Sequence, residues 1–87
     1  MMTISCSESL VDITLGETRR VSVEMQGVTA MMLVAERRPC GRIAHTLVVA
    51  NNFGTEPLRI DGSAGELGAI HEVLMEKLVG AWDVAVH

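Results

Sequence analysis

The chain has 87 residues, which is enough for one domain, 1–87, and leaves no room for a second hydrophobic core. Almost half of it is hydrophobic (48%), but it holds one Phe, one Trp and no Tyr, so the core is expected to be aliphatic. A formal net charge of −4 argues against a dedicated duplex-DNA-binding protein, because such proteins typically carry a basic footprint.

Cysteine usage and hydropathy indicate the compartment. Cys6 and Cys40 lie far apart and form no CxxC motif, which favours free thiols in a reducing compartment. The start of the chain has no pattern of a secretory signal, and no apolar run reaches the roughly 18 residues that a membrane span needs. We therefore expect a cytoplasmic protein with no membrane segment.

The first predicted strands alternate apolar and polar residues, which is typical of half-buried strands. Residues 11–15 show this period of two, and residues 21–25 repeat it after a break at Gly16. Gln26 and Gly27 follow, and they predict a tight hairpin turn because glycine accepts a positive φ.

The next strands are more apolar. Residues 28–35 carry apolar side chains on both faces, which predicts a central strand covered on both sides. A turn is expected over 37–42, where Pro and Gly stand together. Residues 43–50 predict another strand, and 58–60 a short fifth one.

A helix is predicted to follow directly. Ser63 and Glu66 have the spacing of a capping box, in which each side chain bonds the backbone N–H of the other residue. The expected buried face consists of Leu67, Ile70, Leu74 and Leu78. Gly80 stands where a helix-ending glycine belongs, and the alternation over 82–86 predicts a short terminal strand.

This order predicts an α+β fold, with an antiparallel sheet of four to five strands followed by one C-terminal amphipathic helix packed on one face. One helix covers only one face of a sheet, whereas the segment 28–35 needs cover on both. Either the sheet curls on itself or a second subunit supplies the missing layer. We expect the second, a homodimer.

The candidate reactive side chains form no recognisable catalytic motif. Cys40 is the best candidate nucleophile, but a strand places His45 more than about 10 Å away from it unless the turn folds back. Together with Cys6 and His71 these residues have no chelating spacing. The sequence therefore predicts no enzyme, no cofactor and no metal.

Three glycines, Gly62, Gly65 and Gly68, surround the predicted helix start. They do not match a phosphate-binding loop, because no lysine accompanies them and Glu66 would repel an anion. We expect Gly65 and Gly68 to let the helix approach the sheet closely.

Three arginines flank the Pro-Cys-Gly turn and are the candidate partner-binding residues: Arg37, Arg38 and Arg42. Planar guanidinium groups suit bidentate contacts to carboxylates of a protein partner. The other interpretation is an ordinary solvated hairpin tip, because arginine is mostly exposed in folded proteins.

The strand order followed by a helix, over roughly residues 20–79, resembles that of the single-stranded-DNA-binding coactivator and Whirly-type proteins, most closely at 58–67. The resemblance implies a curved antiparallel sheet, a dimer and single-stranded nucleic-acid binding. Sheets that bind nucleic acid this way carry lysines and stacking aromatics, whereas these strands offer only arginines. Those arginines are Arg19, Arg20, Arg37, Arg38 and Arg42.

Our first functional hypothesis is a small, non-enzymatic protein-binding or regulatory module. Inhibitors encoded by phages and mobile elements, which dock on a larger protein complex, share its short, acidic and apolar-rich profile. The alternatives are a single-stranded nucleic-acid-binding dimer and a purely structural homodimer.

Overall fold

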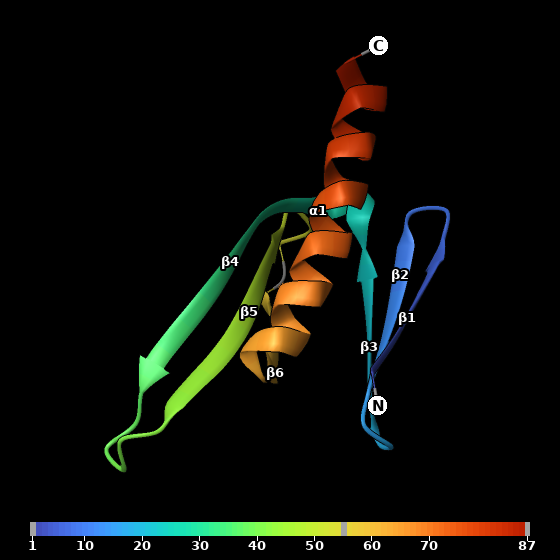
Figure 1. Cartoon of the computed structure of the whole chain (residues 1–87). Coiled ribbons are helices and arrows are strands. Elements are labelled where there is room, and N and C mark those ends of the chain that lie inside the picture. The colour runs from blue at the N-terminus through green and yellow to red at the C-terminus, as the bar shows by residue number, and fades with distance from the viewer. Residues whose placement is uncertain (1, 55, 87) are drawn as a thin grey trace.

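The computed structural model describes residues 2–54 and 56–86, with side chains described through Gly80. Within these residues, six strands form two three-stranded antiparallel sheets, and one helix follows them (Figure 1). The α+β class and the antiparallel pairing agree with the sequence prediction. The single sheet of four to five strands does not, because the strands divide between two sheets.

The first sheet contains β1 (Met2–Ser7), β2 (Leu10–Leu15) and β3 (Arg19–Glu24), in that order. The alternation that predicted β2 is confirmed, since Val11, Ile13 and Leu15 are buried and the residues between them are not. The strand β1 was not predicted. Its apolar alternation consists of Met2 and Ile4 alone, which is too short to predict a strand. Both residues are only half-buried.

The second sheet contains β4 (Val28–Arg37), β5 (Ile43–Asn51) and β6 (Leu58–Gly62), in that order. The prediction of a central strand over 28–35 is wrong, because β4 lies at the edge and β5 is central. Met32 is 57% exposed on one face of β4, and Leu33 is 49% exposed on the other. The apolar residues on both faces of β4 therefore do not reflect cover on both faces within this chain.

The connection between β3 and β4 is also not the predicted hairpin turn. It is a single 3₁₀ turn, η1 (Met25–Gly27), and the strands on either side of it belong to different sheets. Gly27 is buried and does not have a positive φ. Its lack of a side chain matters for another reason, because a Cβ there would lie 2.1 Å from ring carbons of Phe53.

The helix α1 (Ala64–Val86) begins with the predicted capping box. The Glu66 N–H donates to Ser63 Oγ at 3.2 Å, and the Ser63 N–H donates to Glu66 Oε1 at 3.3 Å. The predicted helix end is wrong, because α1 continues through Gly80 and includes the segment expected to form a terminal strand. Figure 1 shows the last turns of α1 rising beyond both sheets.

The core lies between the two sheets and the helix. All four residues of the predicted helical face are buried: Leu67, Ile70, Leu74 and Leu78. The first sheet contributes Val11, Ile13, Leu15 and Val23 to the same cluster, and the second contributes Val28, Leu47, Val49 and Ile60. The helix therefore packs between two sheets, where cover of one sheet face was expected (Figure 1).

The capping box gives a first testable prediction. Replacing Ser63 with alanine removes the acceptor of the Glu66 N–H, so the free energy of unfolding should fall by about 0.5–2 kcal/mol. Urea unfolding followed by circular dichroism measures this change. The matched control is Ser5→Ala, which removes an exposed serine hydroxyl in β1 that makes no side-chain hydrogen bond within the described residues. A free energy of unfolding that Ser63→Ala leaves unchanged would show that the cap contributes nothing to stability.

Candidate functional site

The hairpin between β4 and β5 ends in a tight turn that its sequence specifies. The Gly41 N–H donates to the Arg38 carbonyl at 2.9 Å, and the Arg38 N–H donates to the Arg42 carbonyl at 2.7 Å. Gly41 has φ +89°, a conformation that favours glycine, and Pro39 suits the first central position of the turn. The backbone at this tip is therefore well defined, which confirms the predicted turn over 37–42.

The structure places Arg37, Arg38 and Arg42 together at this turn, and all three are exposed. We call these three residues the arginine tip. Within the described part of the chain they make no side-chain hydrogen bond or ion pair. Ile43, paired with Arg37 across the hairpin, is 55% exposed and adds an apolar patch. Figure 1 shows the turn projecting away from the helix and from the first sheet.

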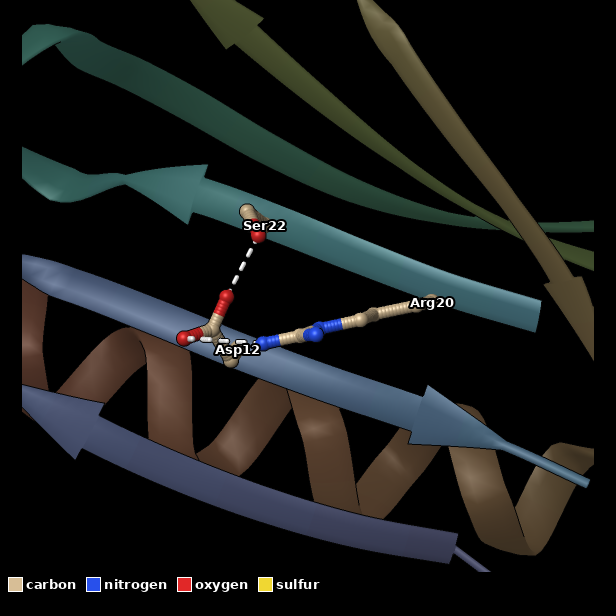
Figure 2. A network of polar contacts seen from close by, with 3 residues as sticks. All are labelled: Asp12, Arg20 and Ser22. Atoms are coloured by element: carbon tan, nitrogen blue, oxygen red, sulfur yellow. Dashed lines mark hydrogen bonds and ion pairs between the residues drawn. The ribbon is translucent and has the colours of Figure 1, made fainter.

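The arginines of β3 have local roles instead. Arg19 donates from Nη1 to the Asp61 carbonyl at 2.8 Å, which joins β3 to β6 across the two sheets. Arg20 Nη2 lies 4.0 Å from Asp12 Oδ2, and Ser22 Oγ donates to the other oxygen of that carboxylate (Figure 2). Within the part of the chain that the structure describes, only the arginines of the arginine tip, among the five weighed for nucleic-acid binding, have no such intramolecular contact.

The opposite end of β4 is acidic. A hollow of about 690 Å³ lies beside η1, and Glu8, Glu76 and Lys77 are among the residues that line it. Glu24, the residue before η1, is exposed and accepts a hydrogen bond from the Gln26 N–H at 3.3 Å. We call Glu8, Glu24 and Glu76 the acidic end. Sequence reasoning missed it because these residues are far apart in the chain: Glu8 lies in the turn between β1 and β2, Glu24 at the end of β3, and Glu76 in α1.

The candidate reactive residues remain separate. Cys40 lies in the exposed turn, whereas His45 lies inside β5 opposite Ala35 and Gly62. No hydrogen bond joins Cys40 to His45 in the described structure. Among the residues searched, which are those the structure describes, no group of three His, Cys, Asp or Glu side chains could hold a metal ion.

The glycines at the helix start do not act as expected. A Cβ built on Gly65 or Gly68 would meet no atom within 4 Å, so close helix–sheet approach does not require these glycines. Of these three glycines, only Gly62 has a neighbouring atom within 4 Å of such a Cβ. Leu67 Cδ2 lies 3.5 Å from it, which is ordinary van der Waals contact.

Comparison with protein-family models, curated proteins and solved structures found no significant match. No helix in the described ranges is long and apolar enough to cross a membrane. The surface features that could bind a partner are the arginine tip, the acidic end and the exposed apolar side chains of β4.

Proposed function

We propose that the chain is a small, non-enzymatic protein-binding module that acts in the cytoplasm and forms a homodimer. Its arginine tip docks on an acidic protein surface. The observation that carries the proposal is that three exposed guanidinium groups lie on one protruding turn and make no side-chain hydrogen bond or ion pair within the described residues. A regulator or inhibitor that blocks a larger complex, as phages and mobile elements encode, would use such a surface.

The chemistry of the tip suits carboxylates. A guanidinium group offers a planar fork of N–H donors, which binds a carboxylate through two parallel hydrogen bonds. Pro39, Cys40 and Ile43 surround the arginines with apolar or weakly polar surface, which is compatible with desolvation at a protein interface.

The surroundings suit single-stranded nucleic acid less well. Binding of that kind combines a basic groove with aromatic rings on which bases stack. Phe53, which is 60% exposed, lies over Gly27 at the start of β4, whereas the arginine tip follows the end of that strand. A strand of this length spans about 30 Å, so the ring and the arginines cannot form one compact platform.

The test is a fluorescence-anisotropy titration with two probes, a labelled single-stranded oligonucleotide and a labelled glutamate-rich peptide. We expect the peptide to bind the wild type and to bind the Arg37→Ala, Arg38→Ala, Arg42→Ala variant at least about tenfold more weakly. The matching triple lysine variant should also bind weakly, because lysine keeps the charge but lacks the planar fork. Arg20→Ala, which removes an exposed arginine elsewhere, is the control and should bind the peptide as the wild type does.

The oligonucleotide should show no saturable binding. Saturable binding below about 10 μM at physiological salt, falling steeply as salt is raised and lost in the triple alanine variant, would contradict the proposal and favour the nucleic-acid-binding alternative.

A further inference from the structure

We propose that the acidic surface bound by the arginine tip is the acidic end of a second copy of this chain. The two copies meet by antiparallel pairing of their β4 edges. This inference rests on the proposed function, because it names the partner of the same arginines.

The first observation is the open edge of β4. This strand is the outer strand of its sheet, and from Val28 to Ala35 it contains no charged residue and no proline. Proteins commonly protect such edges with charges, prolines or bulges. The register shift between Val28 and Ala30 lies at the start of β4, so the stretch from Ala30 to Arg37 pairs regularly and is available on its other side.

The second observation is the exposure of apolar side chains on both faces of this edge. Leu33 shares a face with Leu47, which is buried, but is itself half exposed. Met32 shares the other face with Val48 and is more exposed still. Docking of a helix would cover one of these faces, whereas pairing with another strand covers part of both and satisfies the edge backbone groups.

A second copy of β4 is complementary to the first in a symmetric register. A two-fold axis at Leu33 sets each Leu33 opposite its equivalent and each Met32 opposite Val34 of the second copy. These partners share a face because side chains alternate along a strand. Glu36 then falls opposite the uncharged Ala30, and Arg37 falls beside the uncharged Thr29 at the register shift, so the pairing brings no like charges together.

The charges at the two ends of β4 argue for the same arrangement. The strand β4 follows directly after η1, which lies beside the acidic end, and leads to the arginine tip. Antiparallel pairing therefore carries each arginine tip past the start of the other β4, toward the other acidic end. Three guanidinium groups then approach three carboxylates and one ammonium group, that of Lys77. Symmetry repeats this contact at both ends of the interface.

The apolar edge of β4 and the two charged ends are expected to act together as one interface. A specific interface buries on the order of 1,000 Å² or more in total. The paired strands supply an apolar centre, and the two tip contacts supply a charged rim, which is the usual division in protein interfaces. Binding of another acidic protein at the tip and self-association would then exclude one another.

Sedimentation equilibrium of the full chain tests the arrangement. The wild type should sediment as a dimer, with twice the 9.4 kDa mass of the chain. Leu33→Lys, and the charge-reversed variant Arg37→Glu, Arg38→Glu, Arg42→Glu, should each raise the dimer dissociation constant at least about tenfold. Val79→Lys makes the same kind of change at a residue that is 47% exposed on α1 and should leave the dimer intact. Circular dichroism confirms that each variant is folded.

Reversing the charges on both surfaces gives a more specific test of the contact between the arginine tip and the acidic end. Adding Glu8→Arg and Glu76→Arg to the charge-reversed variant should return the dissociation constant to within about threefold of the wild type, because opposite charges face each other again. A dimer that Val79→Lys dissociates and Leu33→Lys does not would overturn the β4 interface. So would a wild type that is monomeric at high micromolar concentration. Neither result would affect tip-dependent binding of the glutamate-rich peptide, so failure of this inference is distinguishable from failure of acidic-protein docking.

Discussion

Replacing Leu74 with alanine is expected to lower the free energy of unfolding by about 2–5 kcal/mol. Leu74 is fully buried in the middle of the helical row that packs into the shared core. Truncation removes its apolar contacts and leaves a cavity that the strands and helix can fill only in part. Urea unfolding at a fixed protein concentration, followed by circular dichroism, gives the value by linear extrapolation.

The neighbouring residue supplies the control for this prediction. Met75 is 36% exposed on the adjacent position of the same helix, so Met75→Ala should cost clearly less than Leu74→Ala. Leu74→Ala should also cost more than the cap variant Ser63→Ala. If either order were reversed, the assignment of the buried face of α1 would be wrong.

The second large effect concerns the two sheets together. Ile13 of β2 and Leu47 of β5 are both fully buried and belong to one cluster, although they lie in different sheets. Ile13→Ala and Leu47→Ala should each lower the free energy of unfolding by about 2–5 kcal/mol. Because the core is shared, both variants should shift the same single transition.

Differential scanning calorimetry tests this prediction through the agreement of calorimetric and van't Hoff enthalpies. Leu10→Ala, at a position that is 37% exposed, is the control and should shift the transition little. Two separate transitions, each moved by only one of the core variants, would mean that the two sheets unfold independently and that 1–87 is not one cooperative domain.

Local patterns in the sequence predicted local structure well. The capping box at Ser63 and Glu66 and the alternation over 11–15 are confirmed, because each depends on contacts within a few residues. The predicted end of the helix was wrong because glycine, here Gly80, is compatible with both a helix end and a helix interior. In the interior it costs only about 1 kcal/mol relative to alanine.

Pairing between distant segments was harder to predict. The two-faced apolar pattern of residues 28–35 is the same for a central strand and for an edge strand that lacks cover, so periodicity cannot separate the two. The close approach of Phe53 to Gly27 joins two loops whose sequences do not indicate it. Division of the strands into two sheets likewise depends on how the chain passes through η1.

The candidate site shows the same contrast. The turn that carries the arginine tip was predictable, because Pro39 and Gly41 have defined conformational preferences in a tight turn. The acidic end was not, because Glu8 and Glu76 line one hollow only when the turn after β1, η1 and α1 assemble. The charge difference between the two ends of β4 is therefore a property of the fold.

The distance between the two arginine tips in the dimer tests the central claim most directly. A spin label on Cys40 of the Cys6→Ser variant reports it, because both cysteines are exposed and free. Cys40 lies seven residues beyond Leu33, so the two Cys40 residues of the dimer lie at opposite ends of the paired strands. At roughly 3.3 Å per residue, pulsed dipolar spectroscopy should give a distance of about 35–50 Å between the two labels. A distance below about 25 Å, which places the tips side by side, or no dipolar coupling at high micromolar concentration, would contradict the account.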